Sequence, residues 1–226
     1  MTIHIINPNS SAHVTDHMAE AIAPIAAMSP VALACHTLSE GPPGIETQAH
    51  VDGVVQPLLA FSETLKDEAS AFVVACFSDP GLAAMREAHD VPVLGIAESA
   101  YMQAMLMGQR FGILSLGRAS IQRHIRYLGA LGISDRLAAD LPLGLGVLEL
   151  ADEERTLERL SEVGTTLRDR FGADVLITGC AGMAQYRARL ENMTGLPVVD
   201  PCQAAAAAAI GQVMLSACNN KREKRV

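Results

Sequence analysis

Short apolar runs recur along the chain and alternate with longer stretches of helical periodicity. The apolar runs predict strands at residues 2–6, 31–36, 71–75, 92–96, 111–115, 145–149, 174–178 and 197–199. Most of them are rich in Val, Ile and Leu without polar alternation, which is typical of parallel strands buried on both faces. The stretches between them predict helices near 11–27, 47–68, 80–88, 98–108, 118–131, 152–171, 183–194 and 202–218. Repeated βα units predict an α/β fold with parallel sheets and right-handed crossovers.

The two halves of the chain resemble each other. Residues 71–76 read AFVVAC and residues 175–180 read VLITGC, and a Pro-bearing strand follows 16 residues after Cys76 and 17 after Cys180. A polar turn also follows the first strand of each half and opens a helix. At 226 residues the chain is long enough for one large or two small domains. We therefore expect two pseudo-symmetric α/β domains, residues 1–97 plus 201–226 and residues 98–200.

The repeat assigns one cysteine to the end of a strand in each half. Ligands of open α/β sheets bind at the carboxyl ends of the strands, so Cys76 and Cys180 are expected to converge on one cleft between the domains. Each thiol directly precedes a predicted helix, whose positive end favours the thiolate. One thiol per related half suits a reaction in which a base takes a proton from one face and an acid returns it to the other. Cys35, Cys202 and Cys218 lack such matching positions, and we expect them in the core.

Charge and cysteine usage exclude several classes of protein. The net charge of −8 argues against binding to nucleic acid, which requires basic patches. The basic run Lys221–Arg225 reads as a solvated tail, and the Ala-rich stretch from Ala204 to Cys218 as a buried helix. No basic, apolar leader and no uninterrupted apolar span of about 18 residues is visible, which predicts no membrane association. Five cysteines without regular spacing favour reduced thiols in a cytoplasmic protein.

Several short motifs carry further expectations. In the turn Asn7–Ser11, exposed amide, hydroxyl and backbone N–H groups of Asn9 and Ser10 can hold a carboxylate or imide. Asp79 is placed to cap the helix that follows Cys76. His13 and His17 have a spacing that suits a metal, but no third ligand is evident, so we expect no metal site. Gly-Lys-Ser/Thr and Gly-x-Ser-x-Gly motifs are absent from the sequence, which argues against nucleotide binding and a serine nucleophile.

At these residues the chain resembles the aspartate/glutamate racemase superfamily, and within it the hydantoin and allantoin racemases. The matching segments span residues 6 to 201 and are Ile6–Ser10, Gly41–Thr47, Ala75–Leu82, Gly95–Glu98, Gly179–Met183 and Pro197–Pro201. Glutamate racemases carry Asn-Thr after the first cysteine and Thr-His after the second, whereas this chain has Phe77-Ser78 and Ala181-Gly182. The missing polar anchors favour a neutral ring over a free amino acid. The related arylmalonate decarboxylases keep one of the two cysteines, so having both favours racemisation.

The resemblance implies a racemase of a 5-substituted hydantoin or allantoin that works without a cofactor and forms a homo-oligomer. Cys76 and Cys180 would exchange the roles of base and acid. The expected substrate contacts are Asn9, Ser10, Phe77, Ser78, Ser115, Gly117, Ala181 and Gly182. Among these, the backbone N–H groups of Phe77, Ser78 and Gly117 and the Ser115 hydroxyl would bind the enolate oxygen. An amino-acid racemase, a maleate-type cis–trans isomerase and a non-catalytic binding module for small molecules remain the alternatives.

Overall fold

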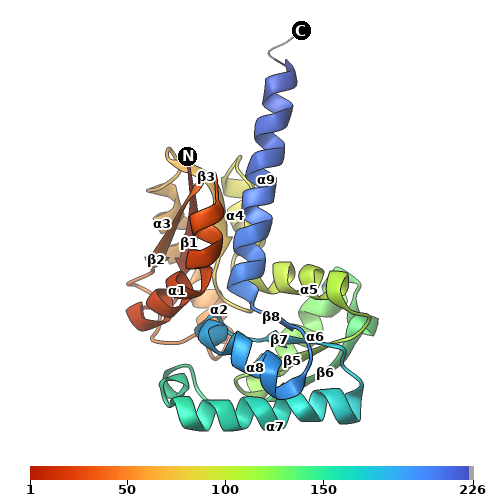
Figure 1. Ribbon diagram of the computed structural model, residues 1–226. Helices are drawn as coiled ribbons and strands as arrows, with labels where there is room; N and C mark the ends of the chain where they lie inside the picture. Colours follow the sequence, from red (N-terminus) through yellow and green to blue (C-terminus); the bar gives the residue numbers. More distant parts are fainter. Residues whose placement is uncertain (224–226) are drawn as a thin grey trace.

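Two four-stranded parallel sheets form the framework of the protein (Figure 1). The computed structural model describes residues 1–223. The strands are β1 (Thr2–Asn7), β2 (Ala32–Thr37), β3 (Ala69–Val74), β4 (Val93–Gly95), β5 (Phe111–Ser115), β6 (Leu137–Pro142), β7 (Val175–Thr178) and β8 (Val198–Val199). The order is β2-β1-β3-β4 in the first sheet and β6-β5-β7-β8 in the second. The second sheet thus repeats the topology of the first, as the matching sequence segments predict.

Nine α-helices and three short 3-10 helices connect these strands within residues 1–223. The α-helices are α1 (Ala12–Met28), α2 (Gln48–Gly53), α3 (Val55–Glu63), α4 (Leu82–Ala88), α5 (Ile96–Met107), α6 (Arg118–Leu131), α7 (Glu153–Phe171), α8 (Arg187–Thr194) and α9 (Pro201–Glu223). The 3-10 helices are η1 (Ser134–Arg136), η2 (Leu148–Ala151) and η3 (Ala181–Tyr186). Helices follow almost every strand, so the predicted βα alternation and the α/β class are confirmed.

The central strands are apolar because helices cover both of their faces. Ile3, Ile5 and Ile6 of β1 and Phe72 and Val73 of β3 are fully buried. Ile5 pairs in register with Cys35 of β2 and with Val73 of β3. When both faces of a strand are buried, apolar and polar residues do not alternate along it, and the strand reads as a continuous apolar run in the sequence.

One strand prediction, 145–149, is wrong. The fourth strand of the second sheet is β6, which lies at the sheet edge and pairs only with β5. Its side chains are mostly half-buried, and the run contains Asp140 and ends in Pro142, so it lacks the apolar signature of a central strand. Residues 145–149 instead form a loop that leads into η2, and Leu145 and Val147 bury their side chains from that irregular backbone.

The two sheets share one hydrophobic core. Ile3 and Ile5 of β1 belong to the same buried cluster as Leu114 of β5 and Leu176 of β7. Helix α1 contacts both η3 and α9, and α5 packs against strands of both sheets as well as α9. The domain division into residues 1–97 plus 201–226 and residues 98–200 stays a prediction, and residues 224–226 lie outside the described part of the chain.

Helix α9 is buried only over its first turns. Cys202, Ala205, Ala206 and Ala209 are fully buried, whereas Met214 and the residues that follow it up to Cys218 are exposed. In Figure 1 the far end of α9 stands clear of the other elements. Within the described residues this is the one helix long and apolar enough to suit a membrane span, and because core helices meet the same criterion, that is weak evidence.

The core prediction for the three unmatched cysteines is therefore correct in part. Cys202 is buried, and Cys35 is partly buried against the core. Cys218 is exposed, and its predicted place in the core is wrong because α9 continues beyond the elements that cover its first turns. The side chains of the basic run Lys221–Arg225 lie outside the described residues.

Candidate functional site

Cys76 lies at the end of the third strand of the first sheet. The N–H of Ala75 still bonds to Ile6 of the neighbouring strand at 2.8 Å, and the chain turns at once, with the Asp79 N–H donating to the Cys76 carbonyl at 2.9 Å. The Ser78 backbone N–H acts to lower the pKa of the thiol. The side chain is partly buried. This turn holds the sulfur at the carboxyl end of the sheet, where the strand pattern predicts it.

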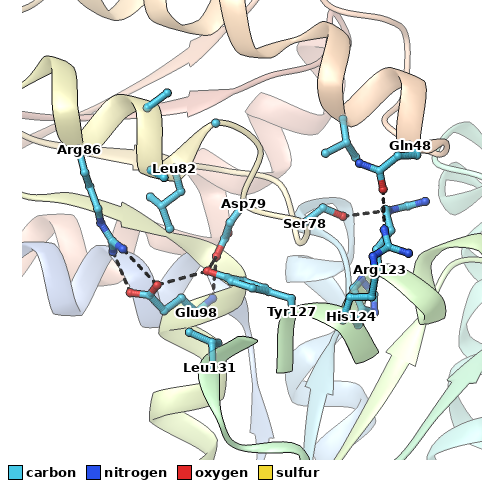
Figure 2. A pocket seen from close by; sticks show the side chains of 15 residues that line it. Gln48, Ser78, Asp79, Leu82, Arg86, Glu98, Arg123, His124, Tyr127 and Leu131 are labelled. Atoms are coloured by element: carbon cyan, nitrogen blue, oxygen red, sulfur yellow. Dashed lines mark hydrogen bonds and ion pairs between the residues drawn. The ribbon is translucent and has the colours of Figure 1, made fainter. Parts of the chain in front are cut away.

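Asp79 fixes the same turn, although it does not cap the helix that follows. Its backbone has a φ of 43°, and its buried carboxylate accepts hydrogen bonds from the N–H groups of Ala97 and Glu98, both at 2.9 Å, and from the Tyr127 hydroxyl at 3.1 Å (Figure 2). It therefore caps α5 instead of α4, which corrects the sequence interpretation. Gly95 makes this contact possible, because a Cβ at that position would lie 2.1 Å from the Asp79 carboxyl carbon.

Cys180 occupies the corresponding place in the second sheet. It follows β7, and the Gly179 N–H bonds to Leu114 of β5 at 2.9 Å, as Ala75 bonds to β1 in the first half. The Gly182 N–H donates to the Cys180 sulfur at 3.4 Å. In both halves the backbone N–H two residues ahead of the thiol acts to lower its pKa. The helix after Cys180 begins with the 3-10 turn η3.

The two thiols line one narrow cavity of about 30 Å³. Six predicted site residues share it: Asn9, Cys76, Phe77, Ser78, Cys180 and Ala181. The other four predicted residues, Ser10, Ser115, Gly117 and Gly182, do not line it. Ile45 and Val147 form part of its wall, and their segments are joined by the Val147 N–H, which donates to Glu46 Oε1 at 3.0 Å. This space holds about one water molecule, so the site is nearly closed.

The turn after β1 is held together by its own amides. Asn7 donates to Asn9 Oδ1 at 3.0 Å and to Thr15 Oγ1 at 3.1 Å, and the Ser11 N–H also donates to Asn9 Oδ1. Within the described residues, the Asn9 side-chain N–H₂ donates to no protein acceptor, so it is free to contact a ligand in the cavity. The Ser10 N–H is bonded to the Pro42 carbonyl at 3.0 Å, which places Ser10 in the scaffold of the turn.

Ser115 takes part in a buried network instead of facing the cavity. Its hydroxyl donates to Asp140 Oδ1 at 2.5 Å and lies 3.1 Å from His124 Nδ1, which itself contacts Asp140 Oδ2 at 2.7 Å. The side chains of His124 and Asp140 are almost completely buried. Because both Ser115 and Asp140 contact the same imidazole nitrogen, the three groups do not form a relay from hydroxyl to histidine to carboxylate. The network instead fixes the imidazole that lines the cavity.

Arg123 and His124 also line the cavity, and neither was predicted from the sequence as a site residue. The Arg123 guanidinium extends from α6 to the first half of the protein, where it donates to Ser78 Oγ at 3.4 Å and to the Glu46 carbonyl at 3.2 Å (Figure 2). The residue is 8% exposed. Polar residues on the buried face of a predicted amphipathic helix were the available signal, since Arg123 and His124 precede the buried Leu128 by about one turn.

Burial dominates the acidity of both thiols. It raises the pKa of Cys76 to about 12, against the opposing effect of the Ser78 N–H. It raises the pKa of Cys180 to about 11, against the opposing effect of the Gly182 N–H. The expectation that a position before a helix favours the thiolate is therefore outweighed by desolvation. Both thiols are protonated for most of the time at neutral pH.

The described residues offer no cluster of three or more His, Cys, Asp or Glu side chains that could hold a metal. His13 and His17 lie with their ring centroids 3.9 Å apart on α1, and within residues 1–223 no third ligand joins them. All five cysteines are free thiols. The groups that line the cavity can therefore supply a proton donor, a proton acceptor and hydrogen-bond donors.

Comparisons with known proteins agree with this geometry. The family described as Asp/Glu/Hydantoin racemase matches residues 3–209. The hydantoin racemase of Paenarthrobacter aurescens is 34% identical over 221 residues, which cover 95% of this chain and 92% of the relative. The allantoin racemase of Klebsiella pneumoniae superposes with a TM-score of 0.87 at 28% identity, covering 96% of this chain and 89% of that structure. The allantoin racemase of Pseudomonas fluorescens superposes with a TM-score of 0.89 at 26% identity, covering 96% of this chain and 92% of that structure.

Proposed function

Because the chain belongs to the Asp/Glu/hydantoin racemase family and is a racemase of the hydantoin racemase branch, we propose that it racemises a 5-substituted hydantoin or allantoin with Cys76 and Cys180. The observation that carries this proposal is that equivalent ends of two repeated sheets present one thiol each to a single cavity. A binding module has no need of such a pair, whereas racemisation requires one acid and one base on opposite faces of a carbon.

The proton transfers balance without an external reagent. The thiolate of one cysteine takes the C5 proton, and the electron pair of that C–H bond moves onto the adjacent C4 carbonyl oxygen. The thiol of the other cysteine then gives its proton to the opposite face of C5, and the electron pair returns to form the second C–H bond. The product is the other enantiomer, and the thiolate now resides on the second cysteine. The two sulfurs exchange roles when the opposite enantiomer reacts.

The enolate oxygen requires donors that are in place before the proton leaves. The Asn9 side-chain N–H₂ and backbone N–H groups at the turns beginning with Phe77 and Ala181 are the candidates at the cavity wall. The Ser78 N–H acts to lower the pKa of Cys76, so its role is to stabilise that sulfur as a thiolate. Ser115 is engaged with Asp140, so the proposed oxyanion site no longer includes its hydroxyl. Gly117 does not line the cavity, so its N–H group is also omitted.

Substrate binding must widen the cavity, since about 30 Å³ is less than a hydantoin ring occupies. The segments that carry Ile45 and Val147 come from different halves of the protein and are joined through Glu46. Their separation would admit the ring between the thiols. Closure would then exclude water, which strengthens every hydrogen bond to the developing enolate.

A panel of substrates tests the proposed activity. We expect loss of optical rotation with single enantiomers of 5-substituted hydantoins or allantoin, and no loss with aspartate or glutamate. Polarimetry with chiral chromatography of the products measures this directly. Racemisation of aspartate or glutamate alone would identify an amino-acid racemase, and binding without turnover of any of the compounds would identify a binding module.

The raised thiol pKa values predict a strong dependence of rate on pH. The reactive enzyme carries one thiolate and one thiol, and with pKa values of about 11 and 12 that form is scarce at pH 7. Its population rises as the pH approaches the lower pKa. We therefore expect kcat/KM to increase about tenfold per pH unit between about pH 7 and 10, after subtraction of the rate without enzyme. A flat profile over that range would show that a thiolate already exists at neutral pH.

We also propose that the protein is a cytoplasmic homo-oligomer. Its five free thiols suit a reducing compartment. The exposed Met214 and Leu215 on α9 offer apolar surface for a second copy of the chain.

A further inference from the structure

Arg123 is a buried cation whose partners are all neutral. Its guanidinium donates to the carbonyls of Glu46 and Ala119 at 3.2 and 3.1 Å, and to the hydroxyls of Ser120 and Ser78 at 3.1 and 3.4 Å. No carboxylate of the described residues forms an ion pair with it. Bonds from a guanidinium to an anionic oxygen are typically about 2.7–2.9 Å long. A buried charge with only long contacts to neutral groups is incompletely compensated.

The carboxyl groups on the segments around Arg123 are engaged elsewhere, and Glu46 is one of them because its Oε1 accepts from the Val147 N–H at 3.0 Å. Asp79 accepts from Ala97, Glu98 and Tyr127, Glu98 pairs with Arg86 at 2.8 Å, and Asp140 is bound to His124. Reorienting Asp79 or Asp140 toward Arg123 would break a helix cap or a buried pair, and reorienting Glu98 would break its ion pair with Arg86 and its hydrogen bond from the Tyr127 hydroxyl. Among the described residues the remaining acidic group that interacts with this charge is the Cys76 sulfur, which is a neutral thiol for most of the time at neutral pH, so an anion on the substrate would complement the guanidinium.

Arg123 lies where the thiol cavity meets a much larger groove. The groove has a volume of about 670 Å³ and shares Ser78, Arg123 and His124 with the cavity. Figure 2 shows it between α6 on one side and the segment from Ser78 to Arg86 on the other. A group attached to a ring between the two thiols would leave the cavity past Arg123 and enter this groove.

The groove wall suits a short chain that carries an acid. Val51, Leu82 and Leu131 contribute apolar surface for methylene groups. Arg126, one turn after Arg123 on α6, also lines the groove, and its guanidinium donates to the neutral Gln48 Oε1 at 2.8 Å. Asp79 and Glu98 also line the groove, but their carboxyl groups are bound by N–H groups of α5 and by Arg86. Arg123 and Arg126 are therefore lining arginines that have no carboxylate partner among the described residues.

We propose that the substrate is a hydantoin whose 5-substituent bears a carboxylate, and that Arg123, with Arg126 beside it, binds this carboxylate at the mouth of the groove. This inference rests on the proposed racemase function and specifies its substrate class. Ring recognition and charge recognition are then separate, with the ring in the thiol cavity and the anion on α6. Arg123 is in this account a specificity residue that touches the substrate. Its charge also lowers the pKa of Cys76, an effect that is the same for a charged and an uncharged substrate.

A matched pair of substrates tests this inference. We would measure kcat/KM for racemisation of 5-(2-carboxyethyl)hydantoin and of its carboxamide, 5-(2-carbamoylethyl)hydantoin, which has nearly the same shape without the charge. The expected result for the unmodified protein is a preference for the acid of at least about tenfold. In R123Q this ratio should fall to about one, and in R126Q it should fall several-fold. R118Q, an exposed arginine of α6 outside the groove, should leave the ratio unchanged.

Three outcomes would overturn the inference. The first is equal or better turnover of the carboxamide by the unmodified protein. The second is a full acid preference in R123Q, which would place the anion elsewhere. The third is no turnover of any hydantoin, 5-isobutylhydantoin included, which would overturn the proposed function as well. Circular dichroism would show whether R123Q folds. If it does not, the inference is judged from the acid-to-carboxamide ratios of kcat/KM for the unmodified protein and for R126Q.

Discussion

Replacing either cavity cysteine with serine should lower the rate of racemisation by about a thousandfold or more. General acid–base catalysis contributes about 10²–10⁴-fold, and each direction of the reaction needs both a thiolate and a thiol. A serine hydroxyl has nearly the shape of the thiol but is a far weaker acid, so C76S and C180S each lose one of the two roles. Chiral chromatography of a single hydantoin enantiomer measures the remaining rate.

The double variant provides a sharper form of this prediction. Groups that act as a unit give strongly non-additive losses, so C76S/C180S should be little slower than either single variant. C218S serves as the matched control, because Cys218 is an exposed cysteine on α9 far along the chain from the cavity residues, and it should retain the full rate. A loss of less than tenfold in either single variant would remove that thiol from the mechanism.

Replacing Asp140 with alanine should lower the free energy of unfolding by about 3–5 kcal/mol. The substitution removes the acceptor of the Ser115 hydroxyl and the partner of His124, and it leaves both groups buried without that partner. Each buried polar group that is left without its hydrogen-bond partner typically costs about 1–3 kcal/mol, and two groups lose theirs here. Urea denaturation followed by circular dichroism measures the change.

Two further variants separate this network from a general effect of losing a carboxylate. D140N keeps one acceptor oxygen, so its free energy of unfolding should fall by less, about 1–2 kcal/mol. D135A removes an exposed aspartate of η1 on the neighbouring turn and should change the stability by no more than about 0.5 kcal/mol. Equal effects of D140A and D135A would mean that the buried contacts of Asp140 do not stabilise the fold.

The sequence predicts the fold where burial alone determines the pattern. The central strands are apolar throughout because helices cover both faces, and the two cysteines are recognisable because each follows such a strand in a repeated order. The edge strand β6 could not be recognised in this way. It has one neighbour and half-buried side chains, while the more apolar run at 145–149 buries Leu145 and Val147 from irregular backbone and leaves Leu148 exposed.

The candidate site was predictable only near the thiols. Asn9, Phe77, Ser78 and Ala181 lie close in sequence to strand ends that meet at one cavity. Arg123 reaches the site from one turn inside α6 by extending a long side chain across to Glu46, and no local pattern shows where such a side chain ends. The environment of Ser115 depends on Asp140, which lies on the strand that the pattern missed.

The acidity of the thiols also required the tertiary structure. The position of each cysteine before a helix is visible in the sequence and favours the thiolate. The desolvation of the thiols depends instead on Ile45, Val147 and other cavity-lining residues from distant segments. In the folded protein desolvation is the larger influence and raises both pKa values. The exposed position of Cys218 likewise depends on where α9 leaves its neighbours.

Enantiomer-specific hydrogen exchange tests the two-thiol account most directly. In deuterated water, the remaining thiolate of C76S or C180S can still remove the C5 proton from its own face and return a deuteron there without changing the configuration. Nuclear magnetic resonance follows the loss of C5–H, and chiral chromatography follows configuration. We predict that the two variants exchange opposite enantiomers of the hydantoin. Exchange of the same enantiomer by both variants would contradict the assignment of Cys76 and Cys180 to opposite faces of the substrate.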